Sequence, residues 1–175
     1  RSLTGPLPGI NELVANAERL IHRGIVAYDA LERIRATPPG ETIPLEARRR
    51  FEENGDALGY ALLLKRYVDD PRQATHEQIL QAAWDTVPSV PLMFWSFRIM
   101  AGIGFAMIAL FATAFVLCSM RRFDQRWFLR LCVLAIPLPW LAVELGWIIA
   151  EMGRQPWAIE GVLPTALGVS SLSRA

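Results

Sequence analysis

The sequence predicts an all-α protein, an integral membrane helical bundle fragment that carries an extracytoplasmic helical loop module. Three observations predict this class. Hydrophobic residues make up 53% of the 175 positions, and this content is too high for an ordinary soluble domain of that length. The charged residues are unevenly spread, since 24 of the 35 Asp, Glu, Lys and Arg residues lie within positions 1–86 whereas positions 99–120 hold none. Two long apolar segments follow the polar half.

The polar half has the pattern of short helices that lie outside a bilayer. Between positions 10 and 34 the apolar residues recur at intervals of three and four, which predicts an amphipathic helix. A break rich in Pro and Gly, ATPPGETIP, occupies positions 36–44, and helix is expected again over positions 45–67. Thr75 and Gln78 then form a capping box in front of ILQAAW, so a further helix is expected to begin there.

The second half contains two spanning segments. Pro91–Met120 and Trp127–Ala150 are each long enough to cross a hydrocarbon core of about 30 Å. Four arginines and one aspartate crowd the connection at positions 121–130, and this excess of positive charge predicts that the connection is cytoplasmic. Pro137 and Pro139 are expected to kink the second helix.

The predicted organisation follows from this topology. Its five parts are an extracytoplasmic helical region at 1–87, a transmembrane helix at 88–120, a cytoplasmic loop at 121–130, a transmembrane helix at 131–152 and an extracytoplasmic segment at 153–175. The chain begins without Met and without a signal-peptide pattern, so we expect it to be part of a longer protein. A net charge of +1 without a massed basic patch argues against nucleic acid binding.

Five residues are predicted to gather in the outer layer of the membrane. Counted from the cytoplasmic ends of the two helices, Met100 and Glu151 each lie 20 residues away, or about 30 Å along the helix axis. They are therefore expected at the same level. Arg98 lies half a turn beyond Met100, Arg154 lies just past Glu151, and Trp147 lies one turn deeper.

Each of these residues also has an ordinary structural explanation. Met100 belongs to a series of methionines spaced by seven, which suits a packing stripe against a neighbouring helix. Arg98 can extend to the outer headgroups, and Trp147 can belong to an aromatic belt. Glu151 and Arg154 are three positions apart and can pair with each other.

Taken together, the residues suit a haem. Arginines at the boundary can neutralise propionates, a thioether is a soft axial ligand, and a carboxylate can bind a high-spin iron. Glu144 lies deeper, where a carboxylate requires a partner, a proton or a cavity. His22 and His76 lie in the polar half and are expected to be solvated, so any histidine ligand would come from chain outside this sequence.

Three ordered motifs resemble subunit I of the cytochrome bd-type ubiquinol oxidases. They are FWSFRIM at 94–100, PLPWLAVELGW at 137–147 and AEMGRQPWAIEGVLPT at 150–165, the last of which contains the GRQPW signature. GYALLLKRY at 59–67 resembles the later part of that family's long external quinol-binding loop. The resemblance covers nearly the whole chain, which would then be the second half of the loop and the two membrane helices that follow it.

The resemblance implies a quinol:oxygen oxidoreductase that reduces oxygen to water without pumping protons. Its cofactors would be a low-spin haem b, a high-spin haem b, and a haem d or a b-type haem in its place. Matched by motif, Met100 resembles the ligand of the low-spin haem b, and Arg98 its electrostatic partner. Glu151 resembles the ligand of the high-spin haem b, with Arg154 close to the haems and Trp147 on the electron path between them.

The resemblance also implies a place and a set of partners. The chain would be active only within a complex of the bacterial cytoplasmic (inner) membrane, with the loop region on the periplasmic side. The implied partners are the remainder of subunit I, subunit II, a small accessory subunit, ubiquinol, oxygen and the lipid bilayer.

Two other interpretations remain open. One is a two-helix membrane sensor or receptor segment with an external ligand-binding helical module, which leaves the charged residues of the outer layer without a task. The other is a structural packing subunit in which these charged residues pair with one another.

Overall fold

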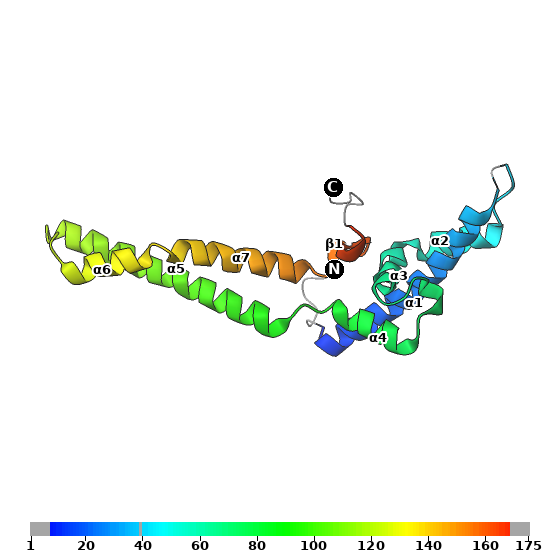
Figure 1. Ribbon diagram of the computed structural model, residues 1–175, viewed down its shortest axis with the longest axis horizontal. Helices are drawn as coiled ribbons and strands as arrows, with labels where there is room; N and C mark the ends of the chain where they lie inside the picture. The colour runs from blue at the N-terminus through cyan, green and yellow to red at the C-terminus, as the bar shows by residue number, and fades with distance from the viewer. Residues whose placement is uncertain (1–7, 39, 169–175) are drawn as a thin grey trace, which may run out of the picture. The chain divides into compact units, whose positions relative to one another are not determined.

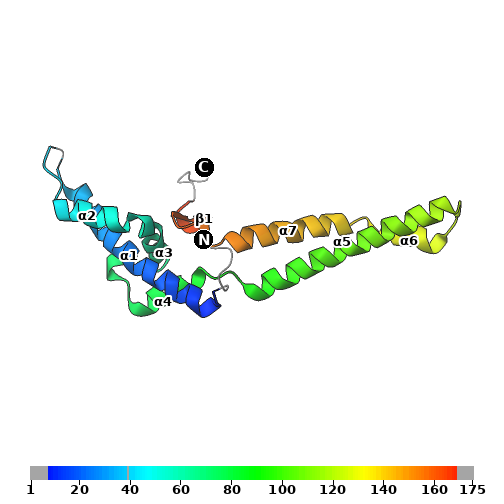
Figure 2. The ribbon, with the colours of Figure 1, turned by 180° about the vertical axis from the view of Figure 1, so that it is seen from behind.

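The computed structural model describes residues 8–38 and 40–168 (Figures 1 and 2). The chain divides into two compact units. The first, the helical module, lies within Arg1–Pro88 and Arg154–Ala175, and the second, the hairpin unit, is Ser89–Gly153. Helices make up almost all regular structure of the described residues, so the all-α prediction is confirmed. The exception is one small two-stranded sheet.

Helix α1 (Ile10–Ala36) is the longest element of the helical module and confirms the amphipathic helix predicted there. Its buried residues follow one face, and most of them are small: Val14, Ala17, Ile21, Gly24, Ala27 and Ala30. Their size permits close packing against α2, η1 and α3. A Cβ atom at Gly24 would lie 2.4 Å from the carbonyl oxygen of Ala57, so the backbones approach as closely there as a glycine allows.

Short helices complete the module. In chain order they are α2 (Leu45–Asn54), η1 (Gly55–Ala57), α3 (Leu58–Leu63), η2 (Leu64–Arg66), η3 (Pro71–Gln73) and α4 (His76–Asp85). The predicted break before α2 and the predicted capping box before α4 are both confirmed. At the capping box the Thr75 N–H donates to Oε1 of Gln78 over 2.9 Å, and the Gln78 N–H donates to Oγ1 of Thr75 over 3.4 Å.

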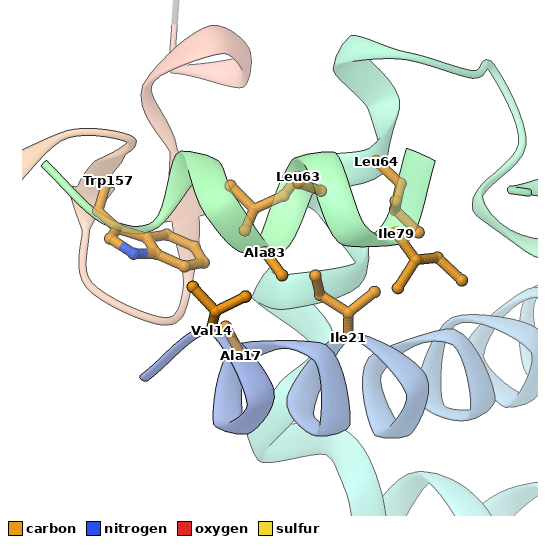
Figure 3. Packing of buried hydrophobic residues seen from close by; sticks show 9 residues of the cluster. Val14, Ala17, Ile21, Leu63, Leu64, Ile79, Ala83 and Trp157 are labelled. Atoms are coloured by element: carbon orange, nitrogen blue, oxygen red, sulfur yellow. The ribbon is translucent and has the colours of Figure 1, made fainter. Parts of the chain in front are cut away.

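The segment after α7 packs into the helical module. Strands β1 (Trp157–Ile159) and β2 (Leu163–Pro164) form an antiparallel hairpin that turns at Gly161, whose φ is +71°, and η4 (Thr165–Leu167) follows. Trp157 is only 6% exposed and meets the Tyr60 ring edge-on, with 5.0 Å between centroids. Figure 3 shows its ring among the buried residues of α1, α3 and α4, beside Val14 and Leu63. This segment is therefore part of the module's core.

The hairpin unit consists of α5 (Val90–Ser119), α6 (Arg126–Ala135) and most of α7 (Leu138–Arg154). Both views show α5 running beside α6 and α7 in the opposite direction (Figures 1 and 2). Two helical stretches are long and apolar enough to cross a membrane, one that includes α5 and one over Arg126–Arg154. The helix is interrupted between α6 and α7 at Pro137, so the predicted kink is confirmed.

The contact between α3 and the β-hairpin predicts a glycine that cannot be replaced. A Cβ atom at Gly59 would lie 2.2 Å from the backbone oxygen of Gly161. Gly59→Ala should therefore destabilise the helical module by about 3 kcal/mol, and limited proteolysis of the membrane-embedded parent protein should cut this module faster. Gly55→Ala is the matched control because its Cβ would only reach ordinary contact, 3.6 Å from Phe51. Equal cleavage rates for the two variants would contradict the prediction.

Candidate functional site

One face of α7 carries the polar and aromatic residues of the second span. Glu144, Trp147, Glu151 and Arg154 follow at intervals of three and four, so they form one row along the helix. Gly146 and Gly153 meet methionines of α5, and they belong to the opposite side of α7. Trp147 is 63% exposed, and neither Glu144 nor Glu151 has a hydrogen bond or an ion pair within the described residues. The row thus faces away from α5.

Glu151 and Arg154, whose spacing would allow an ion pair, do not form one within the described residues. Arg154 takes part in no ion pair within residues 8–38 and 40–168, although it lies one helical turn from Glu151. An i,i+3 pair on a helix surface contributes only a few tenths of a kcal/mol, so its absence costs little. The carboxylate and the guanidinium are consequently both available to groups that lie outside this chain.

Met100 lies on the α5 face that packs against α7. A Cβ atom at Gly146 would lie 3.3 Å from Sδ of Met100, and a Cβ atom at Gly153 would lie 2.9 Å from Cε of Met93. These contacts are seven residues apart on both helices and thus define one register. They give the packing-stripe explanation direct support for Met93 and Met100. The ligand role of Met100 stays a prediction.

The register corrects the expected depth of the two candidate ligands. Met100 is level with Gly146 and its neighbour Trp147, whereas Glu151 lies five residues further along α7, or about 7 Å along its axis. The prediction that Met100 and Glu151 lie at one level is therefore wrong. The count began at position 131 for the second helix, but α6 already begins at Arg126.

Arg98 lies on another side of α5. It is two residues before Met100, which corresponds to a rotation of about 200° around the helix. Its Cζ atom lies 4.2 Å from the centroid of the Phe94 ring, a cation–π contact. Arg98 has no acidic partner within the described residues. The structure thus brings Trp147, Glu151 and Arg154 to one face and leaves Arg98 and Met100 on separate faces of α5.

No group of three or more His, Cys, Asp and Glu residues within the described part of the chain is arranged to hold a metal ion. His76 instead lies in the helical module, with Nδ1 at 3.8 Å from a carboxylate oxygen of Glu18. His22 is exposed on α1.

Two features of the structure were not predicted from the sequence. Gly146 and Gly153 were not recognised as contacts of the methionines, although their spacing of seven matches that of Met93 and Met100. The second feature is a cavity of about 310 Å³ in the helical module. Its walls are Leu62, Leu63, Arg66, Asp85, Gln155, Pro156, Pro164, Thr165, Ala166 and Leu167.

The polar wall of this cavity is an organised cluster. The Tyr67 hydroxyl donates to Oδ2 of Asp85, and Nη1 of Arg66 lies 3.4 Å from the same oxygen. Burial, followed by the hydrogen bond to Asp85, raises the pKa of Tyr67 above its ordinary value. The tyrosine therefore remains a neutral donor at physiological pH, and the Asp85 carboxylate is held in place by two neighbours.

Comparisons with known proteins place the chain in a family. The family model described as cytochrome bd terminal oxidase subunit I matches residues 1–175. The chain belongs to that family. Over 173 residues it is 39% identical to the cytochrome bd-II ubiquinol oxidase subunit 1 of Escherichia coli K12, covering 98% of this chain and 33% of the relative. Over 99 residues it is 40% identical to the cytochrome bd ubiquinol oxidase subunit 1 of Bacillus subtilis 168, covering 56% and 21%.

Membership in the cytochrome bd subunit I family confirms the resemblance carried by the three motifs. The chain spans about a third of the length of the Escherichia coli relative. As part of a cytochrome bd subunit I, the hairpin unit is a membrane-spanning unit, and this accounts for the large apolar side chains exposed along it, such as Phe105, Phe115 and Trp140. The sensor and packing interpretations receive no comparable support.

Proposed function

We propose that this chain is part of a respiratory terminal oxidase subunit that oxidises ubiquinol and reduces oxygen to water. In this proposal it supplies ligands and electrostatic partners to haems near the outer face of the bacterial cytoplasmic membrane. The observation that carries the proposal is the polar row of α7, in which the exposed Trp147 and Arg154 and the half-buried Glu151 share one face where the helix meets the GRQPW signature. The relatives named ubiquinol oxidase support the reaction class.

The donor chemistry of the described residues fits haem. Glu151 has a carboxylate that would hold the iron of a high-spin haem b, and Met100 has a thioether that would hold the iron of a low-spin haem b. A haem d, or a b-type haem in its place, completes the set in the parent protein. When bound, these haems supply electron transfer from quinol and the reduction of oxygen.

The chain's own residues then have distinct tasks. The negative charge of Glu151 would offset the charge of the iron, and the Arg154 guanidinium, one turn away, would neutralise haem propionates. Arg98 provides a second positive charge near the low-spin haem, with its guanidinium oriented by Phe94. Trp147 lies level with Met100 and one turn from Glu151, which suits a position on the electron path between two haems.

The working unit is larger than this chain. We propose that the remainder of subunit I supplies the histidine ligands and covers the polar row of α7, and that subunit II and a small accessory subunit complete the complex. The alternative, a two-helix sensor, gives Glu151 and Arg154 no task. An absorption spectrum of the purified parent protein separates the two functions, because only the oxidase has reducible haem bands.

The methionine stripe provides an internal control for the low-spin haem. Met100→Leu keeps the bulk and removes the sulfur, so this haem should become high-spin or be lost, and quinol oxidation should fall. Met93→Leu changes a methionine with the same kind of glycine contact and should cost less than about 1.5 kcal/mol in stability without altering the spectrum. Reduced-minus-oxidised spectra and quinol oxidation rates are the measurements. Identical behaviour of the two variants would favour the packing stripe.

The carboxylate ligand is tested by separating it from a salt bridge. Glu151→Gln keeps the shape but removes the charge, so the high-spin haem b should be lost while the haem near Met100 stays reducible. Glu160→Gln removes an exposed carboxylate from the same region and should retain every haem. The double variant Glu151→Arg with Arg154→Glu would preserve a simple pair to within a few tenths of a kcal/mol. Full haem content and oxygen uptake in this double variant would refute the ligand assignment.

The sidedness of the chain is a separate part of the proposal. Residues 121–130 are assigned to the cytoplasm, and the helical module and the segment after α7 to the periplasm, because of the arginine excess in the connection. In a background with Cys118→Ser and Cys132→Ser, an impermeant maleimide added to intact spheroplasts should label Glu41→Cys and spare Gln125→Cys. The reverse labelling pattern would overturn the assignment.

A further inference from the structure

The turn between the two spans carries charge that nothing in the described chain neutralises. Residues 121–130, here called the basic turn, cover the connection after α5 and the first turn of α6, and they contain Arg121, Arg122, Arg126 and Arg130 and a single acidic residue, Asp124. All four arginines are exposed. None of them pairs with Asp124 or with another carboxylate of the described residues, although Asp124 is only two positions from both Arg122 and Arg126. The basic turn therefore presents a net charge of about +3 at the end of a membrane hairpin.

One of these arginines, Arg130, lines an apolar groove, and a second, Arg126, lies one helical turn before it. The groove has a volume of about 450 Å³ and is lined by Leu129, Arg130, Val133 and Leu134, all from α6. Arg126 is one turn before Arg130 and lies in the same row of side chains. Leu129, Val133 and Leu134 are 53%, 65% and 71% exposed. The buried residue of α6 is Ala135, which lies on its other side.

The position of the groove along α6 matches the layers of a bilayer. Arg126 is the first residue of the span and Arg130 lies about 6 Å further along the axis, so both guanidinium groups can reach the headgroup layer. The apolar residues Val133 and Leu134 follow one turn deeper, where acyl chains lie. A cationic head and an apolar floor on one helix face complement an anionic amphiphile.

We propose that this face of α6 binds an anionic phospholipid of the membrane. Its phosphate contacts the guanidinium groups of Arg126 and Arg130, and one acyl chain lies along Leu129, Val133 and Leu134. Each basic side chain near an anionic lipid surface contributes about 1 kcal/mol, and guanidinium groups bind phosphate oxygens through paired hydrogen bonds. A zwitterionic phospholipid has the same acyl chains but no net charge, so it lacks the electrostatic part. The binding requires only that the hairpin unit spans a membrane, and it is independent of the oxidase reaction.

The test compares two pairs of arginines that carry equal charge. The purified parent complex in detergent is titrated with phosphatidylglycerol, or with phosphatidylcholine of the same acyl chains, and lipid adducts are counted by native mass spectrometry. Arg126→Gln with Arg130→Gln should remove one tightly bound phosphatidylglycerol, with an affinity loss on the order of 25-fold for the two charges. Arg121→Gln with Arg122→Gln removes the same charge away from the groove and should retain that adduct. Phosphatidylcholine binding should be alike in all forms.

A third variant tests the groove itself. Val133→Trp keeps all four arginines but fills the apolar part of the groove with a larger side chain, so it should weaken binding of the same phosphatidylglycerol. The haem spectrum of each variant verifies that the complex is intact. Equal losses in the two arginine double variants would mean that only diffuse charge matters and would overturn the site. The proposal would also be overturned if the adduct were retained both in the Arg126→Gln, Arg130→Gln double variant and in the Val133→Trp single variant. The groove would then be covered by protein.

Discussion

A membrane tolerates a glutamate only when a counter-charge, a ligand or a proton compensates it, and α7 carries two glutamates. At the bilayer centre the cost is about 3 kcal/mol or more. Glu144 and Glu151 both lie on the face that turns away from α5, and no described residue compensates them. The other side of α7 carries Gly146 and Gly153, where two methionines of α5 approach closely. The division of α7 into a packing face and a polar face underlies the proposed haem contacts.

The GRQPW signature connects these two faces to the helical module. Gly153 receives Met93 of α5, Arg154 ends the polar row, and Gln155 and Pro156 line the cavity of the module. Trp157 is buried in the module's core against Tyr60. Five consecutive residues thus serve helix packing, charge and core formation, so the motif has structural reasons for its composition in addition to the proposed iron chemistry at Glu151.

The elements of the fold were predictable from local patterns, whereas several tertiary details were not. Apolar periodicity predicted α1, and Thr75 with Gln78 predicted the start of α4, because both depend on neighbours within one or two turns. The buried face of α1 was less accessible to prediction, since Gly24, Ala27 and Ala30 are buried for their small size and not for their hydrophobicity. The β1–β2 hairpin was missed because it depends on the contact between Gly59 and Gly161, which are distant in sequence. Among the site residues, the row on α7 follows from spacing alone, but the register of α5 against α7 depends on matching methionines to glycines.

That matching also limits how the hairpin can slide. The contacts of Met93 with Gly153 and of Met100 with Gly146 repeat every seven residues, so a shift of α5 along α7 by any smaller step would bring a methionine against a residue with a side chain. A shift of seven residues would restore one pair, but it requires about 10 Å of movement, which the short stretch between α5 and α6 cannot supply. The two helices can therefore pack in only one register. The contacts of the two methionines with Gly146 and Gly153 fix the depth of Trp147 relative to Met100. A single-residue insertion in the basic turn would either be accommodated within that turn or would displace both methionine–glycine contacts together.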